Sequence, residues 1–205
     1  MAGALPNAGH RALATLERGG VLSGVVTQNV DRLHRAAGSQ RVVELHGALA
    51  EVRCLGCGAT EARDRLQGRL QSLNPGLSSA RAELAPDGDA ELAAELLAGF
   101  NVPSCEACGG VLKPNVVFFG EGVPRETVAD AYALVDAADA LLVLGSSLAV
   151  FSGFRFVKRA HESGRPIGVM NVGETRADAL ASVRVEGRIG ELLPRLVEAL
   201  GVPAS

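Results

Sequence analysis

The residues best suited to chemistry lie in one short stretch near the start of the chain. They are Gln28, Asn29, Asp31, His34 and His46. The first three follow the β-branched run of residues 24–27, which predicts a buried strand. Ligands bind at the carboxyl ends of strands in an open parallel sheet, so this position indicates a site. One such side chain alone is typical of a turn cap, whereas three with two histidines behind them favour function.

His46 is the candidate general base. A histidine titrates nearest to neutral pH, as a general base requires. A lone histidine beside a strand is more often structural than catalytic. Here a carboxylate, two amides and a downstream cysteine pair accompany it, and they favour catalysis.

All four cysteines fall in two C-x-x-C pairs, Cys54/Cys57 and Cys105/Cys108, each followed by glycine. Two such knuckles predict one tetrahedral Zn²⁺ held by four thiolates. A closed Cys₄ site has no open coordination position, so this zinc is expected to be structural. A thioredoxin-like redox pair is the alternative, which the repeated knuckle disfavours.

Composition and charge limit which partners and which cellular location are expected for the protein. The chain has 205 residues, 47% of them hydrophobic and 21% charged, and a formal net charge of −3. That charge, without a basic face carrying aromatics, argues against a nucleic-acid partner. No apolar run is long enough to cross a membrane, and the first sixteen residues lack the pattern of a secretory signal. We therefore expect a cytoplasmic protein with no membrane partner.

Strands alternate with helices along the chain. Helices are expected over residues 7–18, 126–138, 153–162 and 190–200, and strands over 24–27, 116–119, 140–144 and 167–171. This order predicts an α/β fold with a doubly wound, mostly parallel, Rossmann-like sheet. Residues 1–50 and 111–205 would form that domain, and residues 51–110 an inserted zinc module with a helix from Asp89 to Leu97. The continuous apolar strand 140–144 predicts a sheet covered on both faces.

Three predicted strand ends carry small or polar residues. They are Gln28/Asn29/Asp31, Gly145/Ser146/Ser147 and Asn171/Gly173. Each alone is an ordinary strand-to-helix turn, but together they outline one crevice suited to a dinucleotide. No G-x-G-x-x-G follows a strand, so the residues by themselves indicate only a nucleotide-like site.

The motifs, taken in order, resemble the sirtuins, the NAD-dependent protein lysine deacylases. They are T-Q-N-V-D-x-L-H (27–34), H-G (46–47), the first C-x-x-C, P-N-V-V-F-F-G-E (114–121), G-S-S-L-x-V (145–150) and M-N-V-G (170–173). The resemblance covers Pro6 to Leu200. The sequences S-G-F-R-F (152–156) and G-E-L-L-P (190–194) are most similar to the class II branch.

The resemblance implies a set of site residues. The implied NAD-binding residues are Gln28, Asn29, Val30, Asp31, Gly145, Ser146, Ser147, Asn171, Val172, Gly173 and Ile189. The first four belong to the nicotinamide side, residues 145–147 to the adenosine half and phosphates, and the rest to the adenine end. His46 would be the general base. The implied peptide-binding residues are Val116, Val117, Phe118, Phe119 and Gly120, which would pair with an acyl-lysine peptide by strand addition.

The implied reaction uses NAD as the source of the electrophile. The acyl oxygen attacks the nicotinamide ribose as nicotinamide leaves, His46 removes a ribose hydroxyl proton, and free lysine and O-acyl-ADP-ribose result. Two alternatives stay open. One is mono-ADP-ribosylation of protein at the same NAD site, and the other is a catalytically inactive, zinc-binding interaction module.

The sequence departs from the family pattern in one respect. The G-A-G-x-S loop and the G-I-P-D-F-R segment of sirtuins do not occur in these 205 residues. We therefore expect the chain as given to lack the first strand and its phosphate-binding loop. Because backbone N–H groups at such a loop bind pyrophosphate, weak NAD binding and little deacylase activity are expected of it.

Overall fold

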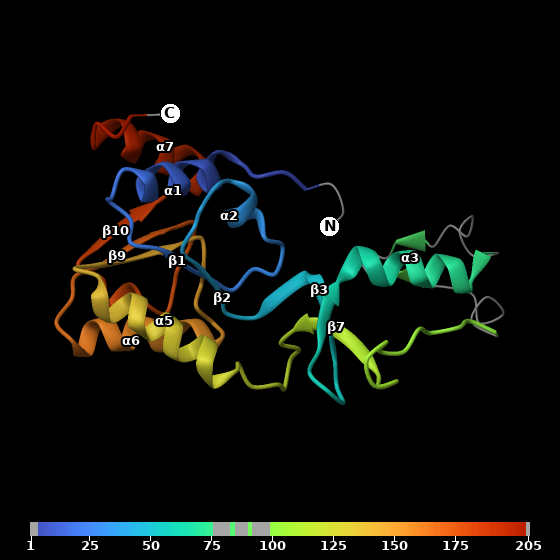
Figure 1. The fold of residues 1–205 in the computed structure, drawn as a ribbon. Coiled ribbons are helices and arrows are strands. Elements are labelled where there is room, and N and C mark those ends of the chain that lie inside the picture. The colour runs from blue at the N-terminus through green and yellow to red at the C-terminus, as the bar shows by residue number, and fades with distance from the viewer. Residues whose placement is uncertain (1–3, 76–82, 85–89, 92–98, 204–205) are drawn as a thin grey trace. The chain divides into compact units, whose positions relative to one another are not determined.

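The computed structural model describes residues 4–75, 83–84, 90–91 and 99–203 (Figure 1). The chain divides into two compact units. Unit 1 comprises Met1–Gly47 and Val117–Ser205, and unit 2 comprises Ala48–Val116. No helix within the described ranges combines the length and the apolar character needed to span a membrane.

The strands of unit 1 are all parallel. Strands β1 (Val25–Thr27) and β2 (Val42–Glu44) form one sheet, and β8 (Leu141–Leu144), β9 (Ile167–Asn171) and β10 (Val183–Glu186) form another in the order β10-β9-β8. The prediction of a parallel α/β fold is confirmed. Within the described residues, however, β1 and β8 belong to different sheets.

The helices of unit 1 cover the strands from two sides. They are α1 (Ala8–Arg18), α2 (Leu33–Ala36), α5 (Arg125–Ala137), α6 (Phe151–Glu162) and α7 (Ile189–Ala199), with a 3₁₀ turn, η2, at Asp178–Leu180. Figure 1 shows α1 and α7 on one side and α5 and α6 on the other. One core joins Val143 and Val169 of the sheet to Phe156 of α6. The second joins Leu13 of α1 to Leu193 of α7 and Met170 of β9.

Helix α1 begins where the sequence predicts. The Asn7 side chain accepts a hydrogen bond from the His10 backbone N–H, and the His10 ring accepts one from the Asn7 N–H. This reciprocal capping box satisfies two of the N–H groups that a helix start leaves unpaired. The chain turns away after Arg18 through Gly19 and Gly20, the latter at a φ of 72°.

Unit 2 is built on an antiparallel sheet. Strands β3 (Gly47–Cys54), β4 (Thr60–Ala62) and β7 (Leu112–Val116) pair in the order β4-β3-β7, followed by α3 (Arg63–Leu73) and the short pair β5 (Glu83–Leu84) and β6 (Ala90–Glu91). Arg69 of α3 contacts Glu61 of β4 at 2.8 Å, which fixes the helix against its strand.

The strand predicted over residues 116–119 is displaced. Strand β7 ends at Val116, and the side chains of Phe118 and Phe119 are exposed rather than buried. The Phe118 N–H donates to the Glu121 carboxylate, and the Glu121 N–H donates to the Phe118 carbonyl oxygen. With Gly120 at a φ of 90°, these bonds form a turn that sequence hydrophobicity alone does not reveal.

Two further expectations need correction. A helix was expected over Asp89–Leu97, but Ala90–Glu91 form strand β6, and the other residues of that range lie outside the described ones. Strand β8 was expected to be covered on both faces, yet Leu142 is 39% exposed. β8 is the edge strand of its sheet among the described pairings, so fewer neighbours cover it. Strand β10 was not predicted, and all four of its residues are exposed.

The second core supplies a test of the fold. Leu193 is fully buried, whereas Leu200, at the end of the same helix, is 49% exposed. Leu193→Ala should lower the free energy of unfolding by about 2–5 kcal/mol, because it removes buried methyl groups and leaves a cavity. Leu200→Ala should change it by about 0.5 kcal/mol or less. Urea unfolding followed by circular dichroism measures both, and equal effects would contradict this packing.

Candidate functional site

Gln28 links three segments of unit 1 at the carboxyl end of β1. Its side-chain amide donates to the Ser146 hydroxyl at 3.1 Å, just beyond the end of β8. Its backbone carbonyl oxygen accepts a hydrogen bond from Nδ1 of His46 at 3.1 Å. Three predicted site residues from distant parts of the sequence are therefore joined by direct hydrogen bonds.

Gly153, in the first turn of α6, makes room for Gln28. A Cβ atom at position 153 would lie 2.9 Å from the Gln28 side-chain carbon Cδ, closer than packed atoms normally approach. The absence of a side chain thus lets the Gln28 amide lie against the start of α6. Gly153 therefore contributes to the site by leaving space for Gln28, not by a reactive group.

His46 is held at both ring nitrogens. Nδ1 contacts the Gln28 carbonyl oxygen, and Nε2 lies 2.9 Å from the Ser152 hydroxyl. The ring is half-buried, and Gly47 follows at a φ of 76°. The His46 backbone oxygen accepts from the Val117 N–H at 2.9 Å. His46 therefore has a fixed orientation, as a general base needs.

The loop after β8 is held in a tight turn. Gly145 is exposed and has a φ of 57°. The Leu148 backbone N–H donates to the Ser146 hydroxyl at 3.2 Å, and Leu148 itself has a φ of 55°, which is uncommon for a residue with a side chain. The Ser147 carbonyl oxygen accepts from the Arg176 N–H at 3.0 Å, which ties this loop to the one after β9.

The turn after β9 is stabilised by hydrogen bonds from the side chain of Asn171. Asn171 is buried, and its amide donates to the carbonyl oxygens of Val172 and Gly173. The Arg184 guanidinium donates to the same Gly173 oxygen at 2.9 Å. Asn171 therefore shapes the turn, while Val172 and Gly173 form its exposed surface.

Ile189 lies beside the first of these loops. A Cβ atom at Gly145 would be 3.4 Å from Cγ1 of Ile189, which begins α7. The ends of β8 and β9 and the start of α7 thus come together. The backbone N–H groups that begin α7 add a positive end to this region.

The other residues predicted for the nicotinamide side have local partners. An Asp31 carboxylate oxygen accepts from the Leu33 N–H at 2.9 Å and so begins α2. Asn29 is exposed, and its backbone N–H donates to the Thr27 hydroxyl. Val30 is half-buried. Asn29, Val30 and Asp31 follow Gln28 in the chain, and the contacts described for them are local rather than to His46.

Sequence reasoning missed three residues that shape the site. Ser152 contacts His46, Gly153 accommodates Gln28, and Arg176 donates to the Ala149 carbonyl oxygen while its guanidinium stacks 4.4 Å from the centre of the Phe154 ring. The first two lie in the S-G-F-R-F stretch that resembles the class II branch, but that resemblance assigned them no role. Nothing in the sequence indicates Arg176.

His10 and His34 form a second pair of rings, with centroids 4.7 Å apart. The pKa of His34 is lowered by burial first and then by its neighbour His10, with Asp31 opposing. The pKa of His10 is lowered by burial, again against the attraction of Asp31. Both rings are therefore neutral where an exposed histidine would already be charged.

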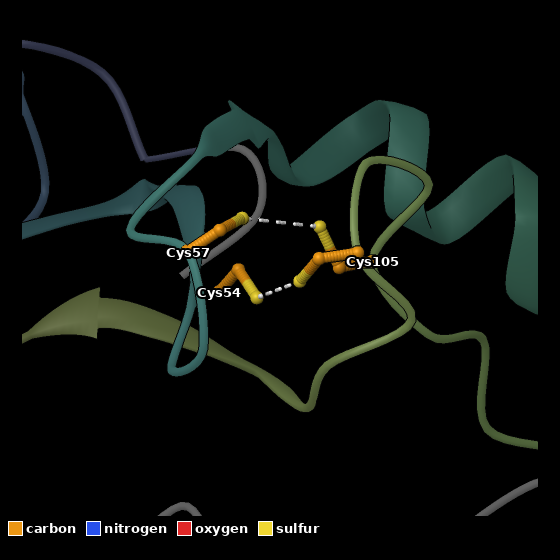
Figure 2. Close-up of side chains that lie close together, drawn as sticks. Cys54, Cys57 and Cys105 are labelled. Atoms are coloured by element: carbon orange, nitrogen blue, oxygen red, sulfur yellow. Dashed lines mark hydrogen bonds between the residues drawn. The ribbon is translucent and has the colours of Figure 1, made fainter.

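The four cysteines of unit 2 form one cluster. Their sulfur atoms all lie within 4.8 Å of one another. Cys54 and Cys108 are 3.5 Å apart at sulfur, and Cys57 and Cys105 are 3.8 Å apart (Figure 2). Thiolates around tetrahedral Zn²⁺, each about 2.3 Å from the metal, lie about 3.8 Å apart. The observed spacing therefore fits a structural Cys₄ zinc site.

The thiols of this cluster have unequal acidities. Backbone hydrogen bonds, first from Cys57, lower the pKa of Cys54 to about 6. At Cys108 a backbone bond from Gly110 favours the thiolate, but the sulfurs of Cys54 and Cys57 outweigh it and raise the pKa to about 12. Placing several thiolates together is thus unfavourable without a cation, which Zn²⁺ supplies.

These features define a class of protein. A parallel α/β unit carries polar turns at three strand ends and an oriented histidine, and a second unit carries a structural Cys₄ site. This combination is typical of a dinucleotide-binding enzyme with a zinc module.

The chain belongs to the Sir2 family, whose model matches residues 1–152. It is 53% identical over 202 residues to NAD-dependent protein deacetylase 1 of Mycobacterium avium, covering 96% of this chain and 71% of that one. It is 56% identical over 190 residues to the NAD-dependent protein deacetylase of Xanthomonas campestris, covering 93% of this chain and 65% of that one. The resemblance to the sirtuins is confirmed.

A solved structure of Sir2 with a p53 peptide and NAD⁺ has the same fold. Its TM-score is 0.76 at 32% sequence identity, and the match covers 98% of this chain and 72% of that chain. The present chain thus spans 65% to 72% of the length of these three proteins.

The half-buried pair of His10 and His34 makes stability depend on pH. His10 and His34 bind protons less readily in the folded protein than in the unfolded chain, so acid favours unfolding. Stability should be full above the ordinary histidine pKa of about 6.5 and should fall as the pH drops below it. Urea midpoints at pH 7.5 and 5.5 measure this loss, which His34→Gln should reduce. An unchanged pH dependence in that variant would contradict the assignment.

Gly110 provides a test of the zinc site. A Cβ atom there would lie 2.9 Å from the Cys54 sulfur and 3.2 Å from the Cys108 sulfur, whereas one at Gly68, in the same unit, would meet nothing within 4 Å. Gly110→Ala should weaken zinc binding at least tenfold, and Gly68→Ala should leave it unchanged. Competition with a chromogenic chelator measures both affinities. Wild-type protein should carry one zinc per chain, and folded protein without it would refute the site.

Proposed function

We propose that this protein is an NAD-dependent protein lysine deacylase whose general base is His46. The observation that carries the proposal is the hydrogen-bonded group of Gln28, His46 and Ser146, which joins an oriented base to the turns at two strand ends. The names of the relatives, NAD-dependent protein deacetylases, support the same conclusion.

The residues of unit 1 fit NAD. The exposed turns at Gly145 and Gly173, both with positive φ, allow a ligand to approach the backbone closely. Gln28 and its neighbours Asn29 to Asp31 would face the nicotinamide half, residues 145–147 the central part, and residues 171–173 with Ile189 the adenosine end. When bound, NAD would supply the electrophilic carbon that the protein itself lacks.

His46 would act on a hydroxyl proton. Its Nδ1 faces a carbonyl oxygen, which can only accept a hydrogen bond, so Nδ1 carries the proton in the neutral ring. Nε2 is then the basic nitrogen. The zinc cluster takes no part in this step, because four thiolates leave no coordination position for a substrate.

The exposed turn after β7 would bind the acyl-lysine peptide. Phe118, Phe119 and Gly120 are exposed, with Phe119 fully so. Their extended approach from Val116 and Val117 would offer an edge for strand addition.

We also propose a cytoplasmic location for the protein. Four cysteines arranged as metal ligands, rather than as disulfides, are suited to a reducing compartment.

Incubation with NAD and an acetyl-lysine peptide tests the activity. Nicotinamide and deacylated peptide in equal amounts would support the proposal. ADP-ribose attached to protein would instead indicate a transferase, and neither product would indicate an interaction module. The assay should use both the 205-residue chain and a chimera that adds a sirtuin G-A-G-x-S segment, since that loop is expected to contribute to pyrophosphate binding.

His46→Ala should lower the rate of deacylation by about 10²–10⁴-fold in whichever form is active, because it removes general-base assistance. Zinc content and the unfolding midpoint should be little changed. His161→Ala is the matched control: it removes an exposed histidine of α6 and should keep full activity. Ordinary turnover by His46→Ala would exclude this residue as the base.

A further inference from the structure

Ser152 is the one side chain that contacts the basic nitrogen of His46 in the described part of the chain. Its hydroxyl oxygen lies 2.9 Å from Nε2, 106 residues away in sequence. The opposite nitrogen, Nδ1, lies 3.1 Å from the Gln28 carbonyl oxygen. Both edges of the imidazole ring are therefore engaged before any substrate is present.

These two contacts determine where the protons lie. The Gln28 carbonyl can only accept, so Nδ1 must donate. In a neutral ring Nε2 then has a lone pair and no proton, and the Ser152 hydroxyl must donate to it. The Gln28 contact thus selects the tautomer in which Nε2 is the base, and the Ser152 hydroxyl can serve that tautomer as a donor.

The fold places Ser152 firmly. It lies in the first turn of α6, which packs through Phe156 and Val157 into the larger core of unit 1. The next residue is Gly153, against which the Gln28 side chain rests. The partner of Nδ1 and the partner of Nε2 are thus held by the same helix start.

We propose that Ser152 is a positioning residue that orients the His46 ring and donates to its basic Nε2, in the tautomer that the Gln28 carbonyl oxygen sets; this inference rests on the proposed function of the site. When a substrate hydroxyl replaces it at Nε2, the O–H bond of that hydroxyl breaks and an N–H bond forms at Nε2. The electron pair stays on the substrate oxygen. The new Nε2–H can then donate back to the Ser152 oxygen, because a hydroxyl both donates and accepts.

Nitrogen NMR of the ¹⁵N-labelled chain tests the tautomer without requiring activity. The protein has four histidines, and the spectrum of His46→Ala assigns the signals of His46. In the wild type at neutral pH, Nδ1 should be protonated and Nε2 unprotonated. In Ser152→Ala the Nε2 signal should shift as its donor is lost, and Ser152→Thr, which keeps a hydroxyl, should restore it. A protonated Nε2 in the wild type would overturn the inference, as would an unchanged Nε2 signal in Ser152→Ala.

Kinetics give a second readout in whichever form proves active. Loss of one hydrogen bond to the base should lower kcat for deacylation by about 3- to 10-fold, with little change in KM for NAD. Ser152→Thr should recover most of the rate. Ser163→Ala removes a hydroxyl that donates to the Arg159 carbonyl oxygen at the far end of α6, and it should change neither the rate nor the spectrum. Wild-type kcat in Ser152→Ala would overturn the inference.

The two readouts separate this inference from the proposed function. If the wild type shows the expected tautomer but no form deacylates a peptide, the proposed function fails while the role of Ser152 in fixing the ring stands. If peptide is deacylated and the His46 signals do not respond to Ser152, the function stands and the inference fails. Zinc content and circular dichroism show whether each variant is folded.

Discussion

The site depends on one residue, Gln28, and on the hydrogen bonds at its two ends. Its side chain reaches the turn after β8, its backbone holds the ring of His46, and its flank rests on the start of α6. Strands β1 and β8 belong to different sheets within the described residues. The Gln28 amide is therefore a direct polar link between the two, while apolar packing of the strands with α5 and α6 supplies the bulk of the contact. A single hydrogen bond from a side-chain amide fixes the position of the groups it joins, whereas burial of the apolar core supplies most of the free energy of folding.

Chemistry and structural support lie in different units of the chain. Unit 1 presents an oriented histidine and polar turns, all on backbone held by parallel strands and helices. Unit 2 is a small antiparallel sheet with a thiol cluster and few buried apolar side chains among its described residues. Such a unit has little apolar area to bury, and a metal bound by four thiolates compensates for that. The close approach of Gly110 to two of the sulfurs shows that the loop geometry is fitted to the cluster.

Much of this was readable from the sequence. Alternation of apolar strands with amphipathic helices predicts the parallel α/β fold, because those periodicities directly record which faces are buried. The paired C-x-x-C knuckles predict the sulfur cluster, since each knuckle is a local structure. Helix starts such as Asn7 are equally local. Expectations failed where a nearby polar group decided the conformation: the Phe118–Glu121 turn depends on the carboxylate of Glu121, and hydrophobicity alone placed those residues in a strand.

The sequence by itself thus determined the class of fold and the cysteine cluster, and it predicts His46 as the base. Only the tertiary structure decided how the base is held. Ser152 meets His46 across 106 residues, and Gly153 meets Gln28 across a comparable distance in the chain. A serine and a glycine at a helix start have many ordinary uses, so their types did not indicate which residues they contact. Their role arises because folding brings the start of α6 against the end of β1, and local residue patterns do not encode contacts between segments so far apart.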